Sequence, residues 1–421
     1  MNSTSELSSF AARLRRFIRA ATNAPERPPA DAPIFDRLAL ELFALQFEQN
    51  APYRRFCGTR NVRPDTVAHW TAIPAVPTMA FKELELSCLP VEERTTVFCS
   101  SGTTGHQPSR HFHNAQSLAL YEASLMQWFS AHFQLAAGDV RSLDSSGTQI
   151  RSSGARTILS ASRASAGRKR TRLSALREIQ DAPAGDCQLA IFTPPPAQAP
   201  HSSLVHMFET IRRQLAPGKR PFVGKPAADG AWALEQEAAL ELLRKAAAAE
   251  QPLLMLGTAF SFVHLLDCLA DQDLRLELPP GSCALETGGY KGRSRALPKT
   301  ALHALLSQRL GIPAGHIVCE YGMSELSSQA YDHAIGPSHA TLHAPRPFHF
   351  PPWARVQVIS PETGCEVGEG ETGLIRVFDL ANVYSVMAIQ TEDLGIRCGD
   401  GFELAGRAAS AEPRGCSLLA V

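Results

Sequence analysis

Apolar positions recur at two different spacings along the chain, which predicts helices and strands in alternation. Residues 5–21, 232–250 and 299–310 follow a helical pattern, with Phe10, Leu14, Phe17 and Ile18 on one face of the first. Residues 187–193 and 252–257 are short apolar runs typical of buried strands. Strands that alternate with helices favour a layered α/β fold. Residues 355–404 are rich in Val, Ile, Phe and Gly-containing turns, and they predict a small β-rich lobe.

The first predicted helix carries its arginines largely away from the apolar face. A basic amphipathic helix can bind a membrane or a partner. It can also pack on its own domain, which is the more ordinary outcome. We therefore expect residues 5–21 to pack on the rest of the chain.

Charge and cysteine content narrow the classes of protein. Lys plus Arg and Asp plus Glu both total 41, so net charge gives no support for binding to nucleic acid. The most apolar stretch, residues 253–269, is too short and too polar to span a bilayer. The ten cysteines include no CxxC pair, and the N-terminus has no signal-peptide run, so we expect a cytoplasmic protein with reduced thiols.

Residues 142–172 depart from this pattern, because they are mostly Ser, Gly, Ala and Arg. The basic cluster at residues 168–172 could bind nucleic acid, but it has no interleaved aromatic residues. The composition favours a flexible surface insertion.

A Ser/Thr/Gly loop follows a short apolar run at residues 97–105, VFCSSGTTG. Glycines let a backbone approach an anion closely, and hydroxyl and N–H groups donate to it. The loop lacks the Gly-Lys-Ser/Thr ending of a Walker A motif, which disfavours ordinary P-loop hydrolysis. Alone it predicts either a phosphate-binding loop or a surface turn.

Three further motifs follow in order: LETGGYKGR at residues 285–293, EYGMSE at 320–325, and TEDLG at 391–395 followed by Gly406-Arg407. They combine glycine turns with an aromatic ring, hydroxyls, carboxylates and an arginine. A carboxylate of this kind can bind a ribose diol, and an arginine can hold phosphate.

The ordered set SSGTTG, EYGMSE, TEDLG and GR resembles the adenylate-forming superfamily, which includes acyl-CoA synthetases, luciferases and peptide-synthetase adenylation domains. The combination of LETGGYKGRSR, CEYGMSELSSQAYD and RGCS near the C-terminus is narrower, and it resembles the acyl-protein synthetases of bacterial bioluminescence, the fatty-acid–luciferin-component ligases. The resemblance implies an α/β adenylate-forming core at residues 1–407, with layered α/β subdomains and a β-rich lobe. The usual C-terminal domain is expected to be lacking, with a tail at residues 408–421.

The resemblance also implies roles for particular residues, with ATP and Mg²⁺ as cofactors. The ATP phosphates would be bound by Ser100, Ser101, Gly102, Thr103, Thr104 and Gly105. Gly288 and Gly289 would line the adenine, and Tyr321 would stack on it. Gly322, Met323 and Ser324, which follow Tyr321, would also bind the nucleotide. Thr104 and Glu325 would bind Mg²⁺, Asp393 the ribose, and Arg407 would lie near the nucleotide. The chain departs from the family pattern at residues 106–110, where Arg110 would replace a phosphate-binding lysine. For the lysine of the usual C-terminal domain three alternatives stay open: Lys291 or Arg293 helps orient the carboxylate, adenylation is slow, or another polypeptide supplies the group.

The remaining motif is a cysteine close to the C-terminus, Cys416. A thiolate attacks an acyl-AMP readily. The resemblance therefore implies that a carboxylic acid, expected to be a fatty acid, is activated, passes to Cys416 and is then delivered to a reductase or a carrier protein. An incidental cysteine is the plain alternative. In that case the chain would be a stand-alone acyl-CoA or carrier-protein ligase, or a non-catalytic nucleotide-binding scaffold.

Overall fold

The computed structural model describes residues 3–21, 32–100, 107–133, 188–227, 231–288, 297–336 and 346–408. The helices are α1 (Ser3–Ala20), α2 (Ala32–Gln49), α3 (Ala51–Gly58), α4 (Ala80–Glu83), α5 (Ala115–His132), α7 (Ser203–Leu215), α8 (Gln236–Ala249), α9 (Ala259–Asp271) and α10 (Lys299–Leu310). The strands are β1 (Val76–Pro77), β2 (Thr96–Cys99), β3 (Arg110–His113), β4 (Gln188–Ile191), β5 (Gly224–Pro226), β6 (Trp232–Leu234), β7 (Leu253–Thr258), β8 (Cys283–Thr287), β9 (Ile317–Tyr321), β10 (Ala330–Tyr331), β11 (Ala354–Ile359), β12 (Thr372–Asp379), β13 (Ala388–Cys398) and β14 (Gly401–Arg407).

A sheet in the order β10-β9-β8-β7-β4 forms the centre of the α/β part. Strands β4, β7, β8 and β9 run parallel, and β10 is antiparallel to β9. Alternate strand residues face two different cores. Met255 and Ala284 pack with residues of α8, α9 and α10, whereas Leu256, Leu285 and Val318 belong to the core that contains α5 and α7. The predicted α/β layering is confirmed.

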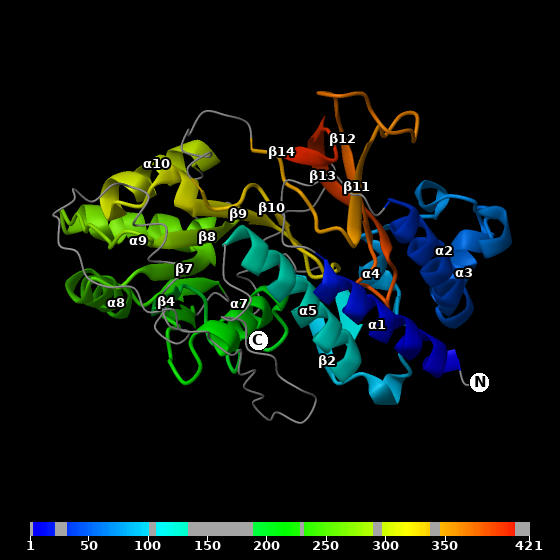
Figure 1. Cartoon of the computed structure of the whole chain (residues 1–421), viewed down its shortest axis with the longest axis horizontal. Coiled ribbons are helices and arrows are strands. Elements are labelled where there is room, and N and C mark those ends of the chain that lie inside the picture. The colour runs from blue at the N-terminus through cyan, green and yellow to red at the C-terminus, as the bar shows by residue number, and fades with distance from the viewer. Residues whose placement is uncertain are drawn as a thin grey trace, which may run out of the picture.

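A second sheet, β1-β13-β12-β11 with β14 on β13, forms the predicted β-rich lobe. Figure 1 shows this lobe between the α/β part and the helices α2 and α3. The predicted strands and helices at 187–193, 252–257 and 299–310 correspond to β4, β7 and α10. The helix predicted at 232–250 is wrong for its first residues: Trp232–Leu234 forms β6, paired with β5, and α8 begins only at Gln236.

Side-chain caps position the helices that follow strands. Thr258 ends β7 and caps α9, because its Oγ1 accepts from the Ser261 N–H at 3.1 Å. Asn114 caps α5 in the same way, through the Ser117 N–H at 2.9 Å. Each helix therefore begins directly at the end of a strand, which keeps the connecting loops short beside the sheet edge.

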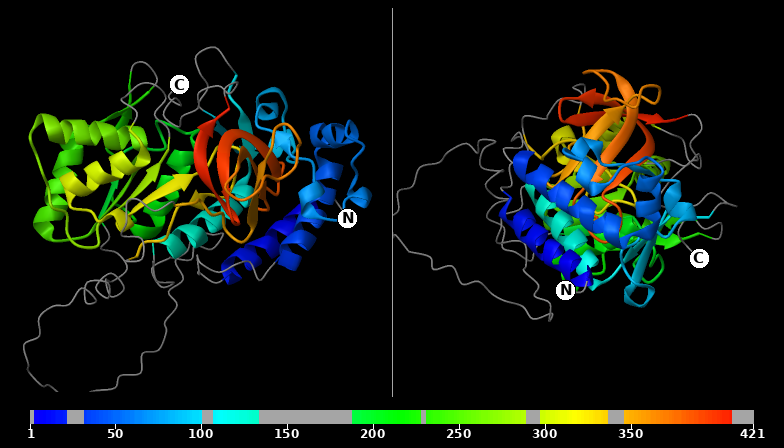
Figure 2. Two further views of the ribbon diagram at one scale, coloured as in Figure 1. Left: turned by 90° about the horizontal axis from the view of Figure 1, so that it is seen from above. Right: turned by 90° about the vertical axis from the view of Figure 1, so that its right-hand side faces the viewer.

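The N-terminal helix packs on its own domain, as expected. Phe10, Leu14 and Ile18 are fully buried, and α1 lies against α5. Figure 2 shows the two helices side by side in both views. None of the described helices combines the length and apolar character that a bilayer span requires. The described cysteines form no disulfide with one another.

Candidate active site

The EYGMSE segment leaves β9 at the carboxyl edge of the parallel strands, which is where open α/β sheets bind ligands. The loop of the SSGTTG motif joins β2 to β3, and the TEDLG motif lies in β13. Residues 321–325 contact both of these elements. They therefore bring together motifs that are widely separated in the sequence.

Glu325 joins this segment to the hairpin of β2 and β3. Its Oε1 accepts a hydrogen bond from Ser109 Oγ at 2.7 Å, and its Oε2 accepts from Ser324 Oγ at 3.0 Å. Ser109 N–H donates at 2.9 Å to the Oγ of Ser100, which is the first residue of the predicted phosphate loop. Asn382 Nδ2 donates to the backbone carbonyl of Glu325 at 2.8 Å. The carboxylate is thus held at the base of that loop.

The two histidines of β3 support this arrangement from the buried side of the hairpin. His111 Nδ1 lies 2.9 Å from the backbone oxygen of Ser324, and His113 Nδ1 lies 3.2 Å from Ser117 Oγ. Burial lowers the pKa of His111 to about 4, so the ring is neutral at pH 7. Within the described ranges no cluster of three His, Cys, Asp or Glu residues could hold a metal. Both rings are buried, and His113 Nε2 has no hydrogen-bond partner among the described residues.

Tyr321, at the other end of the segment, contacts the β-rich lobe. Its hydroxyl donates to Asp393 Oδ2 at 2.9 Å. Arg407 Nε donates to Asp393 Oδ1 at 3.0 Å, and Arg407 also pairs with Glu392 Oε2 at 2.7 Å. The tyrosine, the carboxylate and the arginine assigned to one nucleotide site therefore form a single hydrogen-bonded network.

The pairing of β13 with β14 explains why Asp393 and Arg407 meet. They are directly opposed in the ladder, after a register shift between Leu394 and Gly395. Gly406 has a φ of 130°, a conformation that side-chain-bearing residues rarely adopt, and it lies beside this irregularity. Gly406 thus allows the backbone conformation of β14 that places Arg407 opposite Asp393.

Aromatic rings surround Tyr321, which is largely buried. Its centroid lies 5.1 Å from Phe402 and 6.0 Å from Phe348, with Phe350 edge-on at 6.3 Å. A Cβ added to Gly288, which directly follows the neighbouring strand β8, would meet no atom of the described residues within 4 Å. A planar ring could therefore approach the Gly288 backbone, although adenine stacking on Tyr321 stays a prediction.

Gly322 is crowded, in contrast to Gly288. An added Cβ would lie 2.3 Å from Glu320 Oε1, so the absence of a side chain makes room for that carboxyl. Met323 is partly buried and packs against the larger of the two cores. Ser324 keeps the hydroxyl that binds Glu325.

Several predicted site residues lie outside the described residues. They are Ser101, Gly102, Thr103, Thr104 and Gly105 of the phosphate loop, Gly289, Lys291 and Arg293 after β8, and Cys416 in the tail. The predicted insertion at 142–172 lies outside them as well. Their assigned roles stay predictions.

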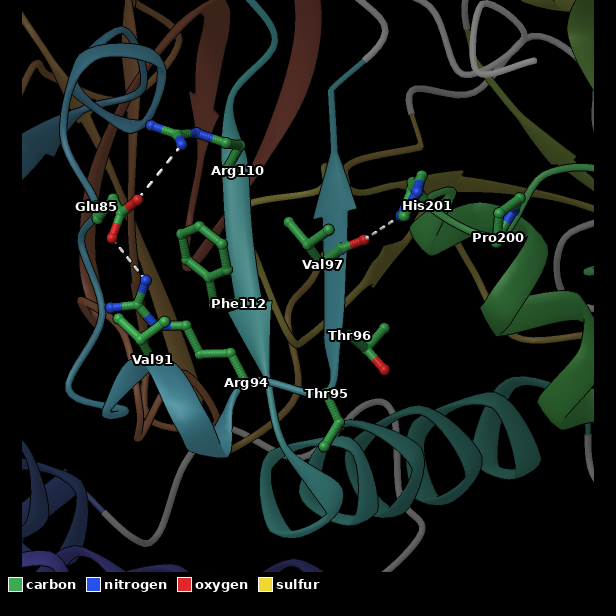
Figure 3. Close-up of a pocket in the computed structure, with 10 residues that line it drawn as sticks. All are labelled: Glu85, Val91, Arg94, Thr95, Thr96, Val97, Arg110, Phe112, Pro200 and His201. Atoms are coloured by element: carbon green, nitrogen blue, oxygen red, sulfur yellow. Dashed lines mark hydrogen bonds and ion pairs between the residues drawn. The ribbon is translucent and has the colours of Figure 1, made fainter. Parts of the chain in front are cut away.

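Arg110 faces away from Glu325, because it alternates with Ser109 and His111 along β3. It lines a surface hollow with Phe112, and its guanidinium lies 3.5 Å from Glu85 (Figure 3). Arg94 binds the same carboxylate at 2.6 Å and stacks over Phe112. In this structure, Arg110 is thus directed toward Glu85 and not toward the carboxylate beside the predicted phosphate loop.

Sequence reasoning missed the supports of the site. Ser109 binds Glu325, but it lies outside the glycine motif and only its spacing from the loop could have indicated it. Glu392 binds Arg407 and was visible as the second residue of TEDLG. Asp379 accepts hydrogen bonds from Ser327 N–H at 2.9 Å and from Ser328 Oγ at 2.7 Å, a long-range link with no local signal.

A largely buried group of ionisable residues also lies on β8, β9 and α10 and directly after β10. Glu286 Oε2 is 3.4 Å from His303 Nε2, and Lys299 Nζ is 3.1 Å from Asp332 Oδ2. Burial, followed by the nearby Glu286, raises the pKa of Glu320 to about 8. Glu320 is therefore mostly protonated and neutral at pH 7.

Comparisons with known proteins agree with this geometry. A family model described as acyl-protein synthetase, LuxE, matches residues 225–420. Comparison with curated proteins finds no match. Among solved structures, a 2-hydroxyisobutyryl-CoA ligase in an open conformation with 2-HIB-AMP and CoA is similar at a TM-score of 0.58 and 12% identity, over 93% of this chain and 79% of the ligase.

A structure of the same ligase in the thioesterification state is similar at a TM-score of 0.57 and 13% identity, over 92% of this chain and 70% of that chain. At such identities the likeness concerns the fold alone. The predicted resemblance to the acyl-protein synthetase family is confirmed over residues 225–420, on the α/β fold of adenylate-forming ligases.

Proposed function

We propose that this chain is an ATP-dependent acyl-protein synthetase, an AMP-forming acid–thiol ligase. The proposal rests on one observation: residues 321–325 join Glu325, at the base of the predicted phosphate loop, to Tyr321, Asp393 and Arg407. A carboxylate beside a phosphate loop and a second carboxylate beside an aromatic ring suit the two ends of ATP. The family match over residues 225–420 supports the same activity.

In the first step, an oxygen of the substrate carboxylate attacks the α-phosphorus of ATP. The bond from that phosphorus to the bridging oxygen breaks, and pyrophosphate leaves with the electron pair. Asp393 would accept hydrogen bonds from the ribose hydroxyls, and Arg407 would remain beside it to neutralise negative charge. The backbone and hydroxyls of residues 100–105 would donate to the phosphates, so that catalysis depends on positioning and charge neutralisation.

The site also fits a magnesium ion. Ser109 and Ser324 each donate to one oxygen of Glu325, and each carboxylate oxygen keeps a further lone pair that can bind a hard cation. Mg²⁺ prefers one or two carboxylates together with substrate phosphates and water. Glu325 would hold the ion with Thr104, and the ion would neutralise charge on the phosphate oxygens.

In the second step, the Cys416 thiolate attacks the carbonyl carbon of acyl-AMP. The carbon–oxygen bond to phosphate breaks, AMP leaves, and a thioester forms. The acyl group would then pass to a partner protein, a reductase or a carrier. A core at residues 1–407 and a tail at 408–421 would suit this transfer, since β14 ends at Arg407. Lys291 or Arg293 would orient the substrate carboxylate.

The first experiment measures acid-dependent exchange of labelled pyrophosphate into ATP with a panel of carboxylic acids. Exchange with one class of acid supports acyl-AMP formation. The absence of exchange with every acid would contradict an enzyme and leave a nucleotide-binding scaffold.

The second experiment follows labelled acid onto the protein after incubation with ATP. Cys416→Ala is expected to abolish covalent labelling while exchange continues. Cys365→Ala, which removes an exposed cysteine in the β-rich lobe, is the matched control and should label normally. Equal labelling of Cys416→Ala and the wild type would rule out the acyl-cysteine step and favour a ligase that uses CoA or a carrier.

A further inference from the structure

A polar row crosses the carboxyl edge of the central sheet. Thr258 of β7 pairs with Thr287 of β8, Thr287 pairs with Glu320 of β9, and Glu320 pairs with Tyr331 of β10. Residues that oppose each other in adjacent strands point to the same face of a sheet. The four side chains therefore lie side by side on one face.

This face is the one that packs toward α5 and α7. Two residues earlier on β7, β8 and β9, it presents Leu256, Leu285 and Val318, which share a core with α5 and α7 residues. The ring of Tyr331 lies 4.8 Å from His132, at the end of α5. The polar row thus lies between this apolar surface and the carboxyl ends of the strands. The residue that follows Glu320 in β9 is Tyr321, which belongs to the nucleotide network.

The row holds buried hydrogen-bonding atoms without partners. Thr287 Oγ1 and Tyr331 Oη have no hydrogen-bond partner within the described part of the chain, and neither does Gln329 Oε1. Thr287 is 3% exposed, Gln329 5% and Tyr331 0%. Such atoms are rare because an unsatisfied buried polar group destabilises the fold, and they require an explanation.

Gln329 belongs to the same surface. It precedes Tyr331 by two residues, and its Cγ lies 3.7 Å from the position of a Cβ at Gly322, which would also meet the Glu320 carboxyl. Thr258, in contrast, is satisfied by its cap of α9. The unpartnered atoms therefore gather around Glu320, between β8 and β10.

We infer that this row recognises a hydroxyl group on the acid that the enzyme activates, so that the substrate class is a hydroxylated carboxylic acid. A hydroxyl donates one hydrogen bond, which Gln329 Oε1 can accept, and accepts others from Thr287 and Tyr331. The row is neutral at pH 7, because burial keeps Glu320 protonated, which disfavours an ammonium group. The inference rests on the proposed function, since it assigns the acid of that same site.

The test compares three acids of equal chain length in pyrophosphate exchange: the unsubstituted acid, its hydroxy derivatives and the corresponding amino acids. One hydroxy acid is expected to exceed the unsubstituted acid in kcat/KM by at least about 100-fold, since sites built for a hydroxyl reject its absence strongly. Thr287→Val and Tyr331→Phe should each reduce that ratio by about tenfold. Thr78→Val, at another buried threonine with an unpartnered Oγ1, should leave it unchanged.

A ratio near one, or a ratio that both variants preserve, would overturn the assignment while acyl-AMP formation stands. If the amino acid is the better substrate, the site recognises an ammonium group and not a hydroxyl, and the assignment is likewise overturned. If no acid supports exchange, the proposed function itself fails. Thermal unfolding of each variant shows whether a lower ratio of kcat/KM comes from misfolding. Calorimetry of the wild type then compares the binding of the hydroxy acid with that of the unsubstituted acid, and equal affinities would overturn the assignment without any variant.

Discussion

Tyr321 donates its hydroxyl hydrogen bond to Asp393 Oδ2 at 2.9 Å, across the boundary between the central sheet and the β-rich lobe. The same carboxylate binds Arg407 on its other oxygen at 3.0 Å. Asp393 is therefore oriented by a residue from each side.

Asp393→Asn is expected to raise KM for ATP by about tenfold or more. It removes a charged acceptor, and a hydrogen bond to a charged group contributes about 1.5–3 kcal/mol. Steady-state exchange at varied ATP measures the change. Glu403→Gln, on the paired strand β14, is the control. A KM within twofold of the wild type would exclude Asp393 from nucleotide binding.

Glu325→Gln should lower the rate of exchange by about 100-fold and increase the Mg²⁺ needed for half-maximal activity. The amide oxygen still accepts from one of the two serines and the amide nitrogen can donate to the hydroxyl of the other, but the side chain carries no charge for a divalent ion. A Mg²⁺ titration of exchange distinguishes this from misfolding. Glu362→Gln, an exposed carboxylate of the β-rich lobe, should behave as wild type. An unchanged Mg²⁺ requirement would contradict the metal role.

Glu320→Gln is expected to stabilise the protein at alkaline pH. Because the folded-state pKa of Glu320 is raised to about 8, its contribution is fully present below the unfolded pKa near 4.5 and is lost as pH rises through 8. At pH 8.5 this loss is on the order of 4 kcal/mol, and the amide avoids it. Urea unfolding at pH 5 and pH 8.5 should show a gap between variant and wild type only at the higher pH.

His111 is expected to change the stability of the fold with pH in the opposite direction. Its pKa is lowered by burial to about 4, so its neutral form stabilises the fold above pH 6.5, and this stability is lost as pH falls toward 4. The loss is on the order of 3 kcal/mol. His111→Asn should therefore show a shallower acid limb in unfolding experiments between pH 6.5 and 4. His69→Gln, at an exposed histidine, should retain the wild-type slope.

Gly395→Ala is expected to destabilise the fold by about 1–3 kcal/mol through overpacking. The added Cβ would lie 2.9 Å from Cγ1 of Ile375, which is fully buried in the β-rich lobe. Gly58→Ala, where an added Cβ meets nothing within 4 Å, is the matched control. Equal unfolding midpoints for both variants would contradict overpacking and show that Ile375 can move to accommodate the added methyl group.

Local patterns predicted much of the fold. The alternation of apolar strands with periodic helices gave the α/β layering, and α10 was predicted over its full length, because these signals depend on neighbouring residues alone. Trp232 was assigned to a helix because its pairing with Pro226 comes from a ribbon that local spacing does not reveal.

The site was predictable only where a motif lies within a few residues. Tyr321, Glu325, Asp393 and Arg407 stand in recognisable strings, and the structure joins them in two networks. Ser109 and Asp379 contact these elements over long sequence separations, so no short window could indicate them. The polar row at Thr287, Glu320 and Tyr331 needs strand register, which no single segment carries.

Residues 321–325 span both networks with a single short stretch of backbone. A ligand that contacts Asp393 and Glu325 at the same time therefore loses its translational and rotational freedom only once. The binding free energy of ATP should therefore be more favourable than the sum of the binding free energies of adenosine alone and pyrophosphate alone, as in a chelate. Paired substitutions at Asp393 and Glu325 should accordingly be non-additive in a double-mutant cycle, despite the distance in sequence between them.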